Sequence, residues 1–297
     1  MRNLKSAVAV LAVAALALPA IASAAYPVKI TTPAGSITLT AKPVRIISLS
    51  PTSTEDLFAV GAGPQVRAVD DQSSYPASAP RTKLSGFTHN VEAIAKYKPD
   101  LVIISNDSGG KLAKRLKALK IPVMLEPAAV KLGDVYAQIN LLGLATGHVP
   151  KAKALVTRMR NQIATIVSSV PKRATPLTYY HELSPDLYSA TSTTFIGQIY
   201  SLLGLENVAD KADSAGTGYP QLNAEYLVAA NPDFVFLADT KCCQQTAATV
   251  AARPGWADMN AVKNGQVVGL DDDIASRWGP RIVNYLRSVA AAVAKAK

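Results

Sequence analysis

Residues 90–104 read NVEAIAKYKPDLVII, and residues 223–237 read NAEYLVAANPDFVFL. The two stretches align without a gap, and their Asn, Glu, Pro and Asp positions coincide, as does the order of apolar residues. Each stretch predicts a short helix, a Pro-Asp turn and an apolar strand. Because the same unit occurs once in each half of the chain, the sequence predicts two equivalent lobes.

Short apolar runs alternate with helical patterns along most of the remaining chain, which indicates parallel α/β sheets. Thr52 and Glu55 have the spacing of a capping box, and the helix that they begin is expected to end near Gly61. Strands are expected at residues 45–49, 66–69, 101–104, 123–125, 177–180, 234–237 and 266–270.

One long helix is expected in the middle of the chain. Apolar residues recur at helical spacing from Pro150 to about Ser169, and Pro171 lies just beyond the end. Such a helix has about 20 residues and a length of roughly 30 Å. The predicted fold is two parallel-sheet α/β lobes, residues 25–149 and 171–297, joined by a linking helix at residues 150–170.

The first 24 residues have the features of a cleaved export signal. Arg2 and Lys5 precede an apolar stretch, and Ala22, Ser23 and Ala24 supply the small residues that a signal peptidase needs. A retained anchor is disfavoured because the apolar core is short for a bilayer span of about 20 residues. No Cys follows this core, so we expect no lipid anchor. The expected product is periplasmic, has 273 residues, and carries a net charge of +8 instead of +10.

Charge and cysteine content limit the function classes. The basic residues are interpreted as scattered, and no aromatic-basic RNA motif is present, so nucleic acid is not an expected partner. A basic surface also favours anionic ligands. Cys242 and Cys243 are adjacent and cannot join distant segments. Two alternatives are open for them: a vicinal disulfide in an oxidising compartment, or two unpaired thiols in a turn.

The segments that follow the predicted strands are the candidates for a ligand site, because open α/β lobes bind ligands beyond the carboxyl ends of their strands. Aromatic faces there suit a large, flat ligand, and packing at the lobe edge is the alternative for any one of them. Arg277 either pairs with one of the aspartates at 271–273 or donates hydrogen bonds to ligand oxygens. The aromatic candidates are Tyr75, Phe87, Tyr188, Tyr219 and Trp278.

Two acids and two histidines are further candidates for function. Glu92 and Glu225 occupy the same step of the repeated unit, each near a helix start where an acid stabilises the helix dipole. Matched acids on two lobes also suit docking to a basic, two-fold partner. His89 and His181 are candidate ligands for iron or cobalt, but metal ligation by either is disfavoured. No Gly-rich phosphate loop or nucleophile elbow is present, which weakens an enzymatic interpretation.

A series of short motifs runs through the mature chain: RIISLSP (45–51), TE (54–55), YP (75–76), GF (86–87), NVE (90–92), KPDLV (98–102), Gly204, ENV (206–208), Arg277 and GPRI (279–282). Together these motifs resemble those of the iron-chelate and cobalamin periplasmic binding proteins. The resemblance implies two lobes bridged by a rigid helix, and an ABC importer with a permease dimer and ATPase subunits as partner. It places the permease-docking acids at Glu92 and Glu225.

The resemblance also bears on the ligand. Cobalamin-binding members carry aromatic residues near Gln72 and at Phe87, and a Trp where this chain has Tyr219; Gln72 departs from that pattern. Haem-binding members often have a ligating Tyr where Phe87 stands, which counts against haem. We therefore expect a monomeric, non-enzymatic receptor without a cofactor of its own, with a corrinoid as the favoured ligand. The alternatives are a ferric-siderophore or haem receptor and, in another class, an exported enzyme that processes metal chelates.

Overall fold

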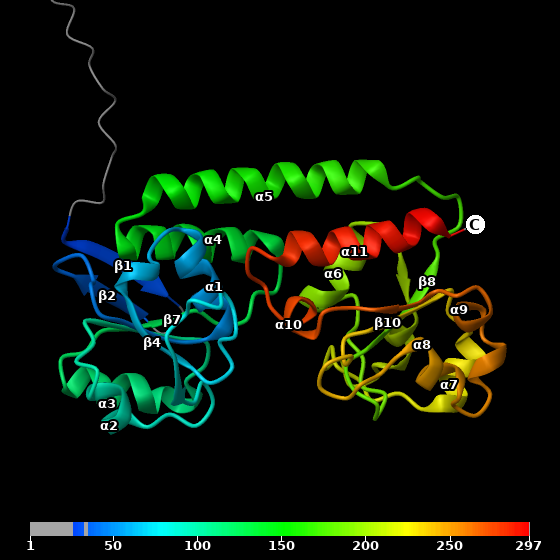
Figure 1. Ribbon diagram of the computed structural model, residues 1–297, viewed down its shortest axis with the longest axis horizontal. Coiled ribbons are helices and arrows are strands. Elements are labelled where there is room, and N and C mark those ends of the chain that lie inside the picture. Colours follow the sequence, from blue (N-terminus) through cyan, green and yellow to red (C-terminus); the bar gives the residue numbers. More distant parts are fainter. Residues whose placement is uncertain (1–25, 33–34, 297) are drawn as a thin grey trace, which may run out of the picture.

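The computed structural model describes residues 26–32 and 35–296, and the predicted signal at residues 1–24 lies outside them. Two lobes stand side by side beneath one long helix, α5 (Val149–Ser169), which spans both of them (Figure 1). This helix confirms the one predicted from Pro150 to about Ser169. Within the described residues, no helix combines the length and the apolar character needed to cross a bilayer.

The first lobe is built on a five-stranded parallel sheet with the strand order β5-β4-β3-β6-β7. Strands β3 and β6 are buried along their whole length, as expected where helices cover both faces of a parallel sheet. The strands are β3 (Ile46–Leu49), β4 (Val66–Asp70), β5 (Arg81–Leu84), β6 (Leu101–Ile104) and β7 (Val123–Leu125). The helices are α1 (Pro51–Ala59), α2 (Val91–Ala95), α3 (Lys111–Ala118) and α4 (Leu132–Thr146), and β1 (Val28–Thr32) and β2 (Gly35–Leu39) form an antiparallel pair.

The second lobe repeats the architecture with a four-stranded parallel sheet in the order β11-β10-β8-β9. Its strands are β8 (Thr178–Glu182), β9 (Glu206–Asn207), β10 (Phe234–Leu237) and β11 (Val267–Gly269). Its helices are α6 (Phe195–Ser201), α7 (Ala224–Ala230), α8 (Ala247–Ala251), α9 (Asn260–Lys263) and α10 (Asp272–Ala275). The fold is therefore the predicted pair of parallel-sheet α/β lobes.

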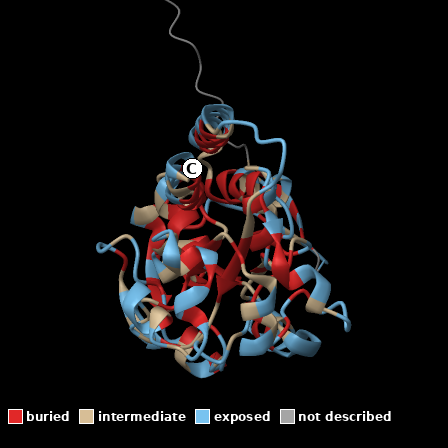
Figure 2. Cartoon of the chain, turned by 90° about the vertical axis from the view of Figure 1, so that its right-hand side faces the viewer, coloured by how far each residue is buried: buried red, intermediate tan, exposed pale blue. Residues whose placement is uncertain are grey.

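A continuous apolar core holds the lobes to the linking helix. The terminal helix α11 (Ile282–Lys295) packs against α5, and α4 packs against α5 from the first lobe. One cluster of buried residues extends from Ile46 in the first sheet through Met159 in α5 to Phe236 in the second sheet. Figure 2 shows this burial in the sheets and on the inner faces of the helices. Helices α4, α5 and α11 thus form a shared helical layer on which both lobes pack, which we call the shared helical base.

The repeated sequence unit is one structural unit used twice. In the first lobe it forms α2 and β6, and in the second it forms α7 and β10. The Asn90 side chain accepts a hydrogen bond from the backbone N–H of Ala93, and the Asn223 side chain accepts one from that of Tyr226. Both asparagines therefore act as N-caps, which accounts for their recurrence.

The aspartate of the repeat has an equally specific role. Asp100 accepts hydrogen bonds from the backbone N–H groups of Val44 and Arg45, immediately before β3. Asp233 accepts hydrogen bonds from the backbone N–H and the hydroxyl of Thr178 at the start of β8. In each lobe this aspartate therefore connects the turn before one strand, β6 or β10, to the start of the neighbouring strand, β3 or β8.

The predicted capping box at Thr52 and Glu55 is wrong. Ser50 is the N-cap of α1, because its side chain accepts a hydrogen bond from the backbone N–H of Ser53, and Pro51 occupies the first turn. This leaves the carboxylate of Glu55 free of a capping role, and it takes part in the contact between the lobes instead.

Candidate ligand-binding site

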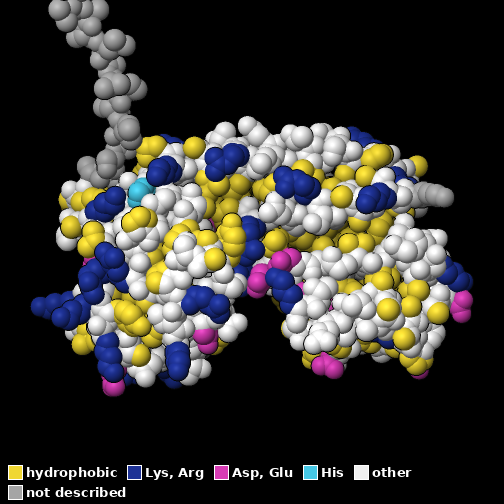
Figure 3. Space-filling model, in the orientation of Figure 1, with side chains coloured by type: hydrophobic (Ala, Val, Ile, Leu, Met, Phe, Trp, Pro, Cys, Tyr) yellow, Lys and Arg dark blue, Asp and Glu magenta, His cyan; other side chains and the backbone are white. Residues whose placement is uncertain are grey.

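The carboxyl edges of the two sheets face each other across the molecule. All strands within each sheet are parallel, so the loops that follow them gather at one edge of each lobe. Arg277, which follows β11, donates a hydrogen bond of 3.0 Å to the backbone carbonyl of Gln72, which follows β4. Figure 3 shows a notch between the lobes on the side away from α5, with charged side chains gathered at its inner end. This notch is the candidate cleft.

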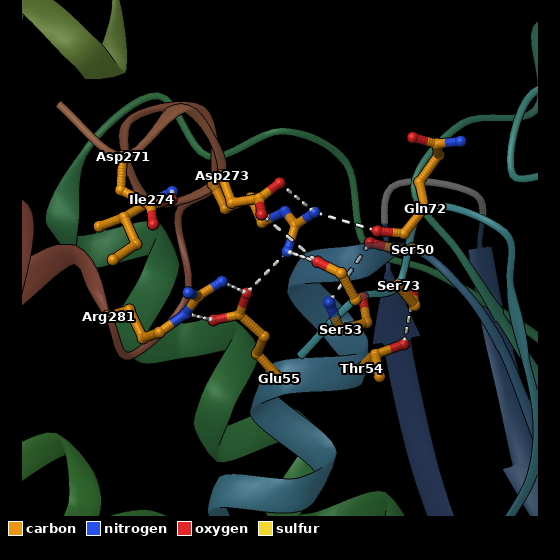
Figure 4. A network of polar contacts seen from close by, with 12 residues as sticks. Ser50, Ser53, Thr54, Glu55, Gln72, Ser73, Asp271, Asp273, Ile274 and Arg281 are labelled. Atoms are coloured by element: carbon orange, nitrogen blue, oxygen red, sulfur yellow. Dashed lines mark hydrogen bonds and ion pairs between the residues drawn. The ribbon is translucent and has the colours of Figure 1, made fainter. Parts of the chain in front are cut away.

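A partly buried ion-pair cluster around the buried Glu55 closes the inner end of the cleft; we call Glu55, Asp273, Arg277 and Arg281 the interlobe clasp. Arg277 lies 3.2 Å from Glu55 and 2.8 Å from Asp273, and Arg281 donates two hydrogen bonds to the Glu55 carboxylate. The Glu55 side chain is only 2% exposed. The clasp connects α1 of the first lobe with α10 and the start of α11 in the second (Figure 4).

Arg277 takes the first of the two roles that the sequence left open, pairing with an aspartate, and adds contacts to the other lobe. It pairs with Asp273, one of the three aspartates considered, but it also contacts Glu55, Ser74 and Gln72 in the other lobe. Its side chain is 12% exposed, so the pairing is not a surface ion pair. Arg281, which the spacing left free to face elsewhere, contacts the same glutamate. Ligand contact by Arg277 stays a prediction.

Four of the five predicted aromatic residues are exposed. Phe87 is 79% exposed, Tyr219 49%, Tyr75 46% and Tyr188 43%, and they make up four of the seven exposed large hydrophobic residues in the described part of the chain. Each lies in a segment that follows the carboxyl end of a strand. Aromatic surface left open on both sides of a cleft is typical of a ligand site.

Tyr75, Trp278 and Gln72 lie in different surroundings. The Arg281 guanidinium stacks on the Tyr75 ring, 4.2 Å from its centroid, so Tyr75 adjoins the clasp. Trp278 packs against the apolar core, and its indole N–H donates a 3.1 Å hydrogen bond to Gln138 of α4. Trp278 therefore joins the second lobe to α4 instead of offering an open ring face. Gln72 is exposed, and its side-chain amide points away from Glu55 (Figure 4).

Two buried acids lie behind the clasp in the first lobe. Asp56 follows Glu55 in α1, and Glu126 follows β7, where it accepts a 3.1 Å hydrogen bond from the Ser53 hydroxyl. Burial raises the pKa of Glu126 from its usual value near 4.5 to about 8. Burial, followed by the charges of Glu126 and Glu55, also raises the pKa of Asp56 well above its usual value. Glu126 is therefore mostly protonated at neutral pH.

The raised pKa of Glu126 predicts a pH dependence of stability. The protonated side chain contributes stability that is fully present below pH 4.5 and is lost as the pH rises through about 8. Glu126→Gln stays neutral, so the free energy of unfolding of the wild type should fall relative to that of the variant across this window. Unfolding by urea at a series of pH values checks this. Parallel curves for the two proteins would show that Glu126 ionises normally in the folded protein.

The second lobe contains a buried charge cluster that the sequence analysis missed. Glu182 ends β8, is fully buried, and pairs with Arg253 through two hydrogen bonds of 2.6 Å. Asp239 follows β10, and burial together with the charge of Glu182 raises its pKa above the usual range. The loop after Asp239 carries Cys242 and Cys243, which form a vicinal disulfide, the first of the two alternatives. The sequence contained one signal for this cluster: Glu182 and Asp239 are acids that stand at or just after the ends of apolar strands.

The two candidate histidines, His89 and His181, lie on different lobes and do not form a common metal site. His181 lies in the core of the second lobe, and its Nδ1 is 2.7 Å from the Tyr200 hydroxyl. Burial lowers the pKa of His181 to about 3, so it is neutral. His89 lies in the segment between β5 and α2, on the first lobe. In the described part of the chain no three His, Cys, Asp or Glu side chains gather in a way that could hold a metal ion.

Glu92 and Glu225 occupy matching places on the two lobes. Each is exposed and lies in the first turn of its helix, α2 or α7. Both helices lie at the ends of the lobes farthest from α5, on the side where the cleft opens (Figures 1 and 3). The two acids are thus available to a partner that spans both lobes.

Known proteins are similar to this chain in both sequence and fold. Residues 46–274 match the family model for periplasmic binding proteins. The chain is 31% identical to the uncharacterized ABC transporter substrate-binding lipoprotein YvrC of Bacillus subtilis, over 86% of this chain and 82% of that protein. It is 30% identical to a cobalamin-binding protein of Halobacterium salinarum, over 86% of this chain and 70% of that protein.

A solved structure agrees with these relatives. It comes from Staphylococcus epidermidis and is described as a "possible" iron-binding, periplasmic solute-binding protein; it is 29% identical, with a TM-score of 0.73, and the match covers 86% of this chain and all of that one. The family model and the Staphylococcus structure are described as periplasmic, and all of these proteins are described as binding proteins. The chain therefore belongs to the periplasmic binding protein family, as a non-enzymatic ABC transporter substrate-binding protein with a cobalamin-binding protein among its relatives.

Proposed function

We propose that this protein captures a metal chelate, with a corrinoid favoured, between its two lobes and delivers it to an ABC permease dimer that carries ATPase subunits. The observation that carries the proposal is the set of exposed aromatic side chains, above all Phe87 and Tyr219, at the facing carboxyl edges of the lobes. Flat rings bury much of a large planar ligand with little loss of rotamer freedom. We further propose that the mature protein is a periplasmic monomer, released by cleavage near Ala24.

The protein groups favour a chelate whose metal already has its ligands. Phe87 has no donor atom for a metal, and His181 is held in the core by Tyr200. A corrinoid supplies its own ligands to cobalt, so it needs ring contacts and hydrogen bonds from the cleft instead of a protein ligand. The Halobacterium relative is named for cobalamin, which supports the same choice. A ferric siderophore is the second candidate, because the Staphylococcus structure is described in terms of iron. Haem ranks below both.

Native mass spectrometry of the protein purified from its own host tests the proposed ligand. A corrinoid should appear as a one-to-one complex, and titration calorimetry with a corrinoid, a ferric siderophore and haem should rank the corrinoid first. Binding of the siderophore alone would move the assignment to the second candidate. Turnover of a chelate without a stable one-to-one complex would contradict receptor function altogether.

We expect Phe87→Ala and Tyr219→Ala each to weaken ligand binding by about 1–3 kcal/mol, since each removes aromatic area that the ligand would cover. Titration calorimetry of the purified variants measures the change. Val44→Ala is a matched control, because Val44 is 52% exposed but precedes β3 and so lies at the opposite edge of the sheet. Unchanged affinity in both aromatic variants would show that the ligand binds elsewhere.

A further inference from the structure

Helix α3 presents a surface that the ligand site does not use. Residues 111–120 contain five basic residues and no acidic residue, so the interpretation of the basic residues as scattered is wrong for this segment. We call these five residues the basic face: Lys111, Lys114, Arg115, Lys117 and Lys120.

The packing of α3 turns all of this charge outward. Leu112 and Leu116 are buried and hold the helix against the first lobe, whereas all five residues of the basic face are exposed. No ion pair recorded among the described residues involves any of the five. Leu119, 53% exposed, adds an apolar side chain among the cations. Because the apolar face of α3 is used by the lobe, any membrane contact here is electrostatic, and clusters of about four to eight cations on an exposed helix are typical of surfaces that bind anionic lipids.

The charge of the molecule is unevenly divided. Residues 25–149 carry 14 Lys and Arg and nine Asp and Glu, a net charge of +5, whereas residues 171–297 carry 11 and 12, a net charge of −1. The basic face accounts for as much charge as the whole excess of the first lobe. An anionic partner is therefore attracted to one end of the molecule in particular.

The basic face lies beside a groove and beside the proposed docking helix. Lys114, Lys117 and Lys120 line a groove of about 730 Å³ between α3 and the β1–β2 pair, and Lys42 lines it from the other side. Helix α3 also packs next to α2, which carries Glu92. In the docked orientation that we propose, α2 faces the permease, and the basic face then lies toward the surrounding bilayer. Figure 3 shows Lys and Arg side chains over this lower part of the first lobe.

We propose that the basic face docks on the headgroups of anionic phospholipids and holds the receptor at the membrane beside its permease. The inference rests on the proposed function for its orientation, but the affinity itself depends only on the charge of α3. Each Lys or Arg at an anionic bilayer strengthens binding about fivefold. Removing three of them should therefore weaken binding on the order of 100-fold.

The test is sedimentation of the full mature chain with vesicles of phosphatidylcholine, alone or mixed in equal parts with phosphatidylglycerol. We expect binding only to the anionic vesicles, and we expect high salt to release it. Lys111→Gln/Lys114→Gln/Lys117→Gln should abolish the binding. The matched control is Lys151→Gln/Lys153→Gln/Arg158→Gln on α5, which removes the same charge from exposed residues on the opposite side; it should bind nearly as well as the wild type.

Several results would overturn the proposal. Equal losses in the two triple variants would show that net charge alone drives binding. Release by inorganic phosphate at the same ionic strength would indicate a small-anion site in the groove. Weaker association of the α3 variant with detergent-solubilised permease, without any vesicle binding by the wild type, would assign the face to an acidic protein surface. None of these readouts uses the ligand, so failure of the ligand assignment leaves this test intact.

Discussion

Glu55→Gln should lower the free energy of unfolding by about 3–5 kcal/mol, because it removes the one carboxylate that Arg277 and Arg281 share. The side chains of Arg277 and Arg281 are only 12% and 17% exposed, so water replaces the lost partner only in part. Asp273 still reaches Arg277, whereas Arg281 loses both of its hydrogen bonds to a carboxylate and keeps its contact with the Tyr75 ring and the more distant charges of Asp271 and Asp273. A neutral amide accepts a hydrogen bond but does not balance two buried positive charges.

Calorimetric unfolding of the ligand-free protein measures this loss. Glu92→Gln is the control, since it removes an exposed acid from the same lobe and should lower stability by no more than about 1 kcal/mol, the upper end of a helix-dipole contribution. Arg281→Lys should give an intermediate loss, because an ammonium keeps the charge but lacks the planar fork. A loss below about 1 kcal/mol in Glu55→Gln would mean that the clasp contributes little and that the shared helical base alone holds the lobes.

The clasp also changes what is expected of Arg277. If Arg277 only donated hydrogen bonds to the ligand, its removal would lower ligand affinity and leave the stability of the ligand-free protein nearly unchanged. In the structure the guanidinium contacts both lobes, so its truncation leaves Glu55 with only Arg281 and breaks the bond to the carbonyl of Gln72. Arg277→Ala is therefore expected to lower stability whether or not the residue contacts the ligand, so this variant cannot separate stability from affinity. The aromatic variants separate them better because Phe87 and Tyr219 are exposed.

The fold was largely predictable because its signals are local. Parallel strands covered on both faces are short apolar runs, and the predicted strands at 123–125 and 234–237 coincide with β7 and β10. The helical spacing of apolar residues over about 20 residues predicted the start of α5 to within one residue. The start of α1 was mistaken because Ser50, Thr52 and Ser53 can all act as caps. Only the backbone geometry, with Ser50 extended, decides among them.

The candidate site was predictable in part. The edge of the sheet at which the aromatic residues lie was predictable because each of them follows a strand, whereas their contact with a ligand stays a prediction. The clasp was not found, since Glu55 and Arg277 lie far apart in sequence and meet only when the lobes are placed together. Trp278 is aromatic and follows a strand, as the other aromatic candidates do. Only the packing of α4 places Gln138 where the Trp278 indole contacts it. Contacts between lobes are tertiary facts that a local pattern does not contain.

Glu92→Lys/Glu225→Lys should abolish ligand uptake through the permease while leaving ligand affinity in solution nearly unchanged. Both carboxylates are exposed, occupy the same step of the repeated unit, and lie on helices at the open end of the cleft. Their role in the helix dipole predicts only a loss of about 0.3–1 kcal/mol of stability for each substitution. A docking role predicts a loss of uptake in addition, because a Lys at each position would repel a basic permease surface.

The two roles separate when uptake and affinity are measured on the same variants. Transport of labelled ligand into proteoliposomes that contain the permease measures uptake, and titration calorimetry measures affinity. Glu206→Lys/Asp258→Lys is the matched control: it makes the same change in net charge at exposed acids outside α2 and α7, and should transport normally. Normal uptake by the Glu92 and Glu225 variant would reduce the two acids to helix stabilisers. A large loss of affinity with unimpaired permease association would instead place them in the ligand site, because a docking residue has no contact with the ligand to lose.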